Sequence, residues 1–272
     1  MNRVGEHPIA AGPLAPRWLA WSLDPPRAGV TSVAHVSLEN AGTATWRSHG
    51  ANGVQASFHW LDPLGNPIVW DGPRTQLPRD VAPGERVEIE LAVTAPRPPG
   101  AYRLSFDLVE EHRFWFEEVG CTPLEIELEV TPRIAERRLA VSMHGGADPA
   151  TTAALAAQEE PMVEADAVAV AHLIAGAVPP PGWSRLLLDG HEEGWVAVGT
   201  AVVPEGRDRE LAPWLGSGGR NPRFSRPLLL PSLLEGIEPT EHLGLPAYDG
   251  PASMFDGRVA VTLPQRSDRR PR

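Results

Sequence analysis

Apolar and polar residues alternate along the chain from about residue 14 to about residue 132, in short runs separated by turn-forming residues. Because successive side chains of a strand point to opposite faces of its sheet, this alternation predicts strands that are buried on one face. The apolar positions are Val30, Ala34, Val36, Leu38; Val54, Ala56, Phe58, Trp60; Val87, Ile89, Leu91, Val93; Tyr102, Leu104, Phe106, Leu108; and Leu124, Ile126, Leu128, Val130. Such strands, with proline and glycine turns at 62–67, 83–84 and 98–100, predict an antiparallel β-sandwich.

An ordered set of short motifs runs through the same segment. The motifs are NAGTATW at 40–46, PGE at 83–85, AP at 95–96 with PGAY at 99–102, and FWF at 114–116. Their order resembles that of the four-tryptophan (FW) immunoglobulin-like domains of selective-autophagy cargo receptors and their bacterial relatives. The resemblance implies an immunoglobulin-like sandwich that serves as a protein-docking or surface-binding module. One departure is Glu117, which stands where a glycine usually follows the late aromatic residues.

Two tryptophans on the alternating strands are expected to lie in the core. Trp60 shares its strand face with Phe58, and Trp46 ends the first motif. A buried aromatic ring contributes a large apolar area, which makes a core position the usual place for a tryptophan on such a face. We therefore predict that Trp46 and Trp60 serve the fold and not recognition.

Two other tryptophans are the candidates for a binding surface. Trp115 is out of phase with its strand, because Phe114 and Phe116 flank it and should point to the opposite face. If Trp115 faces water beside Arg113, it is a suitable anchor for a partner or a sugar ring, because exposed aromatic residues are frequent binding hot spots. Trp70, which follows the turn at 62–67, is the second aromatic candidate.

After residue 132 the pattern changes to continuous apolar runs that alternate with helical segments. The expected elements are strands at 139–143, 167–174 and 195–202 and helices at 150–158 and 182–188, the first helix capped by Asp148 before Pro149. Continuous apolar strands are typical of parallel sheets that are covered on both faces. This order predicts a small βαβ-type α/β domain over 133–263, following the sandwich domain at 14–132.

Parts of this second half resemble family-2-type GT-A glycosyltransferases. The similar pieces are ALAAQ at 154–158, which ends a strand-to-helix run, and PPPGW at 179–183, followed by a helix and AVG at 197–199. The family places an Asp-X-Asp metal-binding motif just before the proline run, where this chain has Ala175, Gly176 and Ala177. Without carboxylates to hold a divalent ion, the resemblance implies a degenerate relative, and we expect neither a metal nor another cofactor.

Other chemistry in the second half is sparse. His144, with Gly145 and Gly146, resembles the His-Gly-Gly of esterase oxyanion loops, but no Gly-X-Ser-X-Gly elbow accompanies it. The expected position of His144 at the carboxyl end of a strand is a common site position in α/β sheets, so we keep it as a binding candidate beside the alternative of a turn-capping or solvated histidine. The apolar segment 228–234 needs a partner surface, which a homo-oligomer could supply.

Composition and charge narrow the classes of partner. The net charge of −11 argues against nucleic acid, because phosphate binding requires a basic face. No stretch approaches the roughly 20 apolar residues of a membrane span. The single cysteine, Cys121, allows no intrachain disulfide, and residues 1–13 form an N-terminal arm without an apolar leader segment, so a cytoplasmic location is expected. Residues 264–272 are expected to form a basic, disordered tail.

Three functional hypotheses follow from these patterns. The leading one is a non-catalytic binding or assembly protein that docks a protein or glycan ligand through the sandwich. The rival is an enzyme-like or accessory factor of bacterial polysaccharide assembly, in which the sandwich binds glycan and the second half retains a sugar-nucleotide pocket. The third is a structural subunit of a larger particle.

Overall fold

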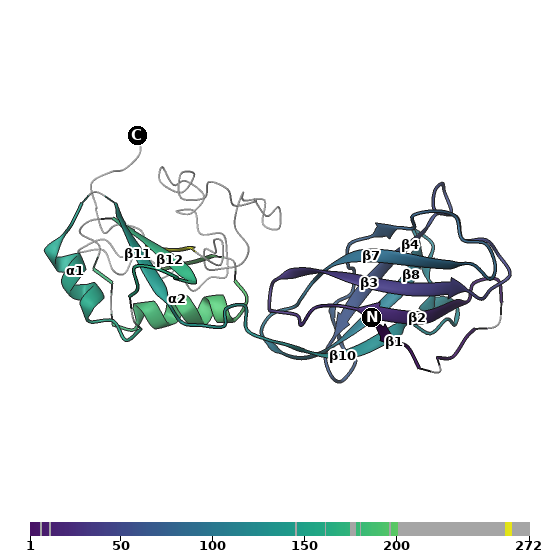
Figure 1. Ribbon diagram of the computed structural model, residues 1–272, viewed down its shortest axis with the longest axis horizontal. Helices are drawn as coiled ribbons and strands as arrows, with labels where there is room; N and C mark the ends of the chain where they lie inside the picture. The colour runs from purple at the N-terminus through teal and green to yellow at the C-terminus, as the bar shows by residue number, and fades with distance from the viewer. Residues whose placement is uncertain are drawn as a thin grey trace. The chain divides into compact units, whose positions relative to one another are not determined.

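The computed structural model describes residues 1–200 and 259–262, with the exception of 6, 11, 145, 161, 175–177, 180 and 196 (Figure 1). The chain divides into two units, Met1–Thr131 and Pro132–Arg272, each of which is described by itself. Three features expected from the sequence lie outside the described residues: the basic tail at 264–272, the apolar segment 228–234, and the residues 175–177 that replace the acidic motif.

The N-terminal unit consists of two antiparallel sheets. The first has the order β1-β2-β3-β7, with β1 (Asn2–Arg3), β2 (Pro16–Ser22), β3 (Thr31–Asn40) and β7 (Arg86–Thr94). The second has the order β10-β8-β4-β5, with β10 (Leu124–Val130), β8 (Gly100–Glu110), β4 (Val54–Leu61) and β5 (Pro67–Val69). Two short strands extend it, β6 (Thr75–Gln76) beside β4 and β9 (Phe114–Trp115) beside β8. This part of the chain is antiparallel β structure, as the alternation predicted.

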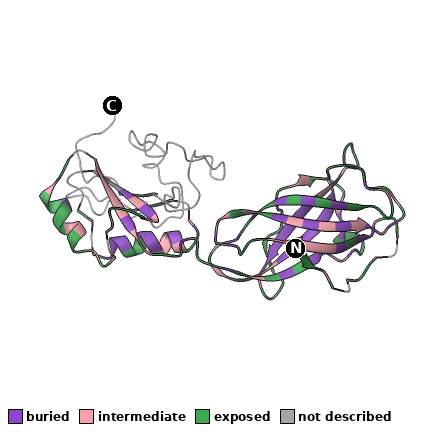
Figure 2. Cartoon of the chain, in the orientation of Figure 1, coloured by how far each residue is buried: buried purple, intermediate pink, exposed green. Residues whose placement is uncertain are grey.

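A single hydrophobic core is shared by the two sheets. Figure 1 draws β2, β3 and β7 in one layer and β4 and β8 in another, and Figure 2 shows buried residues along the strands of both. Most of the alternating apolar residues predicted to face inward are buried in one cluster, and Trp46 and Trp60 belong to it, as expected. Tyr102 and Leu128 are partly buried against this cluster, and Val30, which precedes β3, is not part of it. The indole nitrogen Nε1 of Trp60 donates a hydrogen bond of 2.9 Å to the carbonyl of Thr94, which satisfies its only polar atom in the core.

The first FW-like motif organises a loop at the end of β3. The side-chain amide of Asn40 donates to the carbonyls of Ala44 and Val81, at 2.8 and 2.9 Å, and its oxygen accepts from the backbone N–H of Gly42. A Cβ atom on Gly42 would lie 2.2 Å from the carbonyl oxygen of Pro13, so only glycine fits there. Asn40 and Gly42 therefore have a structural role, because the Asn40 side chain bonds to the backbone of the loop and the glycine allows its close approach.

The C-terminal unit contains a sheet in which every described strand pair is parallel. Its order is β11-β12-β14-β13, with β11 (Leu139–His144), β12 (Ala169–Ile174), β13 (Ala197–Thr200) and β14 (Val259–Thr262). Helices α1 (Pro149–Ala156) and α2 (Trp183–Glu192) follow β11 and β12 in the chain. Asp148 caps α1 by accepting from the backbone N–H of Thr151, as the sequence predicted.

Helix α2 covers the buried residues of this unit with one face. Trp183, Leu187 and Leu188 pack with Leu173 of β12 in a second hydrophobic cluster. Arg137, which precedes β11, holds the polar side of α2 through ion pairs with Asp189 and Glu192, at 2.8 and 2.6 Å. Neither α1 nor α2 has the length and apolar character that crossing a membrane requires.

Candidate functional site

Part of the outer face of the second sheet, on β4 and β8, is unusual because it is polar and yet buried. Ser57 and His59 of β4 point away from the core, since they alternate with Phe58 and Trp60. The strand register places Ser57 opposite Asp107 and His59 opposite Ser105 on β8. All four polar residues are exposed by 2% or less. The segments that follow β4 and β8 must therefore cover this face.

The polar side chains bind the backbone of those covering segments. Ser57 Oγ donates to the carbonyl of Gly72 at 2.8 Å, and His59 Nδ1 donates to the carbonyl of Trp70. The carboxylate of Asp107 accepts from the backbone N–H of Glu117 at 3.1 Å, in the 3₁₀ turn Glu117–Val119, and from its neighbour Leu108 at 2.7 Å. The bonds to Gly72, Trp70 and Glu117 each satisfy a buried polar group and fix a covering segment to the sheet.

A serine, a histidine and an aspartate on one sheet face invite comparison with a catalytic triad. In a triad the serine and the carboxylate both bond to the histidine, and a substrate must reach the serine. Here Ser57, His59 and Asp107 bond to backbone groups of the covering segments and are buried beneath them. Desolvation lowers the pKa of His59 and raises the pKa of Asp107 to about 7, as expected for burial. The arrangement is therefore structural.

An aromatic cluster lies over this polar layer, and we call it the Trp70 surface: Trp70, His59, Trp115 and Arg74. The imidazole of His59 stacks on the indole of Trp70, with ring centroids 4.2 Å apart and an interplanar angle of 22°. Trp115 meets His59 edge-on at 4.3 Å and Trp70 edge-on at 6.3 Å. Trp70 is 48% exposed and Trp115 only 9%. The cluster thus presents one tryptophan to solvent and uses the other residues to support it.

Arg74 completes the Trp70 surface and was not foreseen from the sequence. Its guanidinium carbon lies 4.5 Å from the centroid of the Trp115 ring, a cation–π distance. The same guanidinium forms ion pairs with Asp71 at 2.7 Å and Glu111 at 2.8 Å. The only hint in the sequence was an acid and a base three residues apart directly after Trp70.

The prediction that Trp115 faces water beside Arg113 is wrong. The phase of the strand was predicted correctly, since Phe116 is buried in the core and Trp115 points to the other face. That other face is covered, because Trp115 pairs with Val109 across β9 and β8 and lies under Arg74 and against His59. Arg113 instead forms an ion pair with Glu110 and lies over the ring of Phe114, 5.3 Å from its centroid.

The other two predicted binding residues, Trp70 and His144, lie in different units of the chain. Trp70 is exposed in the aromatic cluster, where the structure brings it together with Trp115. His144 is the last residue of β11, paired in register with Ile174 of β12, and therefore belongs to the C-terminal unit. Within the part of the chain that the structure describes, no group of three or more His, Cys, Asp and Glu is placed to hold a metal ion.

The hairpin that leads to Trp70 adds further exposed apolar side chains. The carboxylate of Asp62 accepts from the backbone N–H groups of Leu64 and Asn66, both at 2.8 Å, which closes the turn predicted between β4 and β5. Leu64 and Ile68 on this hairpin are exposed, like Trp70. A fixed turn that displays large apolar residues next to an exposed tryptophan is typical of an interaction surface.

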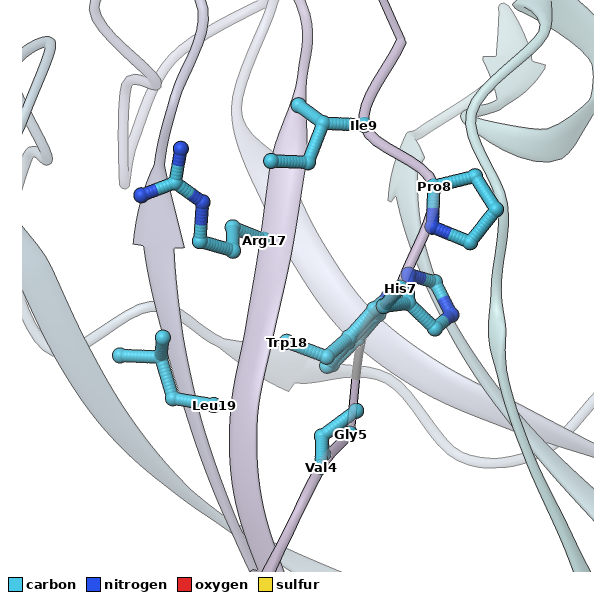
Figure 3. Close-up of a pocket in the computed structure, with 8 residues that line it drawn as sticks. All are labelled: Val4, Gly5, His7, Pro8, Ile9, Arg17, Trp18 and Leu19. Atoms are coloured by element: carbon cyan, nitrogen blue, oxygen red, sulfur yellow. The ribbon is translucent and has the colours of Figure 1, made fainter.

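A second candidate is an open pocket of about 660 Å³ between the N-terminal arm and β2. Figure 3 shows Val4, Gly5, His7, Pro8 and Ile9 beside the strand that carries Arg17, Trp18 and Leu19. His7 Nδ1 is buried without a hydrogen-bond partner among the described residues, but two other polar groups of the pocket are bound within the fold. Arg17 pairs with Glu39 at 2.9 Å, and His7 Nε2 bonds to the carbonyl of Pro123 at 3.0 Å. These bonds hold the arm and the strand in place, so the Trp70 surface is the stronger candidate.

Comparison with known proteins does not identify a family. No protein-family model matches the chain, and no curated protein matches it. Solved structures that match include a family 123 glycoside hydrolase from Clostridium perfringens, studied for the hydrolysis of glycolipid glycans. That match has 11% sequence identity and a TM-score of 0.23, and it covers 44% of this chain and 25% of the hydrolase chain. A TM-score this low does not establish a shared fold.

Proposed function

We propose that the chain is a non-catalytic binding protein and that its N-terminal unit is an immunoglobulin-like sandwich that docks a ligand through the Trp70 surface. The observation that carries the proposal is the state of Trp70, whose indole is half-exposed and yet held by the buried imidazole of His59. The order of the FW-like motifs supports the choice of fold and the docking role. A cytoplasmic location and a small α/β domain in the second half belong to the same proposal.

Preorganisation makes Trp70 suited to binding. An exposed aromatic residue normally loses rotamer freedom when a ligand immobilises it, which subtracts from the affinity. Here the backbone carbonyl of Trp70 is bonded to His59, and the ring stacks on the same histidine. Much of the ordering is therefore complete before a ligand arrives, as in the aromatic hot spots of protein interfaces.

The proposal excludes catalysis at this face because its titratable groups are covered. His59 and Asp107 have shifted pKa values, which is a common property of catalytic residues. Both side chains are buried under the segments that they bind, however, and a general acid or base must come within hydrogen-bond reach of its substrate. Their shifts follow from burial in a structural layer.

The experiment compares ligand capture by the intact chain, by Trp70→Ala and by a control variant. Val33→Ala is the matched control, because Val33 is also about half exposed but lies on β3, in the other sheet. Immobilised full-length protein is incubated with an extract of the cells that make it, and the bound protein and bound sugar are both quantified. We expect Trp70→Ala to lose at least 10-fold of a component that Val33→Ala retains. Equal capture by all three proteins would contradict docking at Trp70.

A second candidate function rests on the C-terminal unit. Its parallel strand pairing places the carboxyl ends of β11, β12, β13 and β14 along one edge of the sheet, with His144 at the end of β11. In open α/β sheets ligands bind outside this edge, which supports a retained sugar-nucleotide site. Calorimetric titration with UDP-glucose and GDP-mannose, with and without Mn²⁺, tests it. Saturable heat at micromolar ligand that His144→Ala weakens would support this function, and the absence of heat with both nucleotides would argue against it.

A further inference from the structure

We propose that the ligand of the Trp70 surface is a neutral sugar ring of a polysaccharide, stacked on the open face of the Trp70 indole. The inference rests on the proposed docking function and names its ligand class. Three properties of the surface lead to it: a fixed ring that is about half exposed, polar groups of both signs beside that ring, and a local excess of negative charge.

The first property is the fixed plane of the indole. His59 covers one face of Trp70 in a near-parallel stack, while about half of the residue remains exposed. The next segment is held tightly against β4, because Gly72 N donates to the carbonyl of Phe58 at 3.1 Å and a Cβ atom on Gly72 would lie 2.6 Å from that oxygen. The C–H face of a sugar ring is flat, apolar and slightly positive, and therefore complements the negative face of a rigid aromatic ring.

The second property is the supply of hydrogen-bonding groups beside the ring. The side chain of Asp71, adjacent to Trp70 in the chain, is 69% exposed although one of its oxygens accepts from Arg74. Glu111 accepts from the Nε of the same arginine and is partly exposed. Carboxylate oxygens accept hydrogen bonds from neighbouring hydroxyl groups, and their pairing with Arg74 holds them in a fixed orientation.

The third property is the local charge, which argues against an anionic ligand, because one guanidinium stands beside two carboxylates. Arg74 lies over the Trp115 ring, and it already binds two carboxylates, Asp71 and Glu111. A nucleotide or another phosphate would need a cation with free hydrogen-bonding capacity, so this surface does not favour one. A neutral, polyhydroxylated ring is not repelled by the excess carboxylate charge.

A sugar also fits better than an apolar protein partner. A protein that covered the surface would remove the carboxylates of Asp71 and Glu111 from water, and burying charged groups is costly unless each gains new partners. Sugar hydroxyls replace the lost water hydrogen bonds while the ring covers the indole. A protein partner therefore becomes an alternative outcome of the test.

The test uses the full chain and soluble neutral hexasaccharides of glucose, mannose, xylose and N-acetylglucosamine as probes. Binding is followed by tryptophan fluorescence and calorimetry for the wild type, Trp70→Ala, Asp71→Asn and the control Val33→Ala. We expect saturable binding of at least one probe, a loss of at least 10-fold in Trp70→Ala, a loss of several-fold in Asp71→Asn, and an unchanged affinity in Val33→Ala. Thermal unfolding of each variant verifies that it is folded.

Two outcomes would overturn the inference, and they separate it from the proposed function. If no neutral probe binds, and the material captured from the extract through Trp70 is protein without sugar, the docking function stands and the sugar assignment is wrong. If UDP or a sulfated polysaccharide binds more tightly than every neutral probe through Trp70, the charge argument is wrong. Capture that is independent of Trp70 would remove both proposals.

Discussion

Strand β4 is buried on both faces, and its two faces are buried by different chemistry. On the inner face, Phe58 and Trp60 pack in the apolar core between the sheets. On the outer face, Ser57 and His59 lie under segments that they bind through the carbonyls of Gly72 and Trp70. Close packing and the burial of apolar area stabilise the inner face, whereas a few directional hydrogen bonds stabilise the outer face.

This difference explains why the outer face can carry a binding surface. A close-packed core resists every change of volume, and its residues are unavailable to a ligand. The covering segment between β4 and β6 is fixed at its backbone, so the Trp70 side chain is free to point outward. A fixed backbone with an exposed ring is the arrangement that preorganised recognition requires.

The largest expected loss of stability comes from truncating a large side chain on the inner face of β4. Trp60→Ala should lower the free energy of unfolding by about 5 kcal/mol, because it leaves a large cavity and removes the indole partner of the Thr94 carbonyl. Urea denaturation monitored by circular dichroism measures the change. A loss below about 2 kcal/mol would mean that the core around Trp60 collapses to fill the space, contrary to its close packing.

The second-largest expected effect is a pH dependence of stability, which arises from Asp107, a buried acid on β8 beside the outer face of β4. Burial raises the pKa of Asp107 from 3.8 to about 7, so the folded protein keeps a proton that the unfolded chain releases between these values. The contribution of Asp107 to stability therefore falls as the pH rises from about 4 to about 7, by on the order of 4 kcal/mol, and stays low above pH 7.

Asp107→Asn isolates this contribution. As the pH rises from 4 to 8, the variant should gain stability relative to wild type, because its amide does not titrate and only wild type loses the Asp107 contribution. His59 works in the opposite direction, because desolvation lowers its pKa below 6.5 and its contribution is lost as the pH falls below that value. It is present in both proteins and cancels in the comparison. A difference that is independent of pH would show that Asp107 is ionised in the fold at neutral pH.

The inner face of β4 could be predicted from the sequence, but the burial of its outer face could not. Alternation identifies the residues that share a face, and a face made of apolar residues is normally buried in a core. Ser57, His59 and Asp107 are polar and alternate as solvent-facing residues do, so the pattern predicts a half-buried sheet. Their burial depends on backbone contacts of segments that have no periodic signal, such as the hydrogen bond from Ser57 to Gly72.

The candidate site shows the same limit. The phase of Trp115 was predictable from its neighbours, but whether its face is open depends on Arg74, a residue 41 positions earlier in the chain that covers the ring.

In the C-terminal unit, local signals such as the Asp148 cap predicted α1 correctly. The position of β14 between β12 and β13 is set by pairing over a long separation in sequence, which no local pattern encodes.

An intermediate loss of stability is expected from a substitution at Gly72, where the covering segment contacts β4. Gly72→Ala would place a Cβ atom 2.6 Å from the carbonyl oxygen of Phe58 and 3.1 Å from its ring, so the segment must move outward. We expect a loss of about 2 kcal/mol in the free energy of unfolding, together with a change in Trp70 fluorescence as its support loosens. Gly5→Ala is the control, since nothing lies within 4 Å of a Cβ atom there. Equal stability of the two variants would show that the contact with Phe58 does not constrain the segment.

The smallest expected change in stability comes from Trp70→Ala, the counterpart of Trp60→Ala on the outer face. The ring is half exposed, so its removal should cost only about 1 kcal/mol, mainly through the lost stack on His59. The same change admits water to His59, and because burial is the largest cause of its lowered pKa, that pKa should rise towards 6.5. An NMR titration of the histidine ring protons measures this shift. An unchanged pKa would show that Trp115 and the backbone, and not Trp70, keep water from the imidazole, and the Trp70 ring would then be a displayed group with no part in sealing the polar layer beneath it.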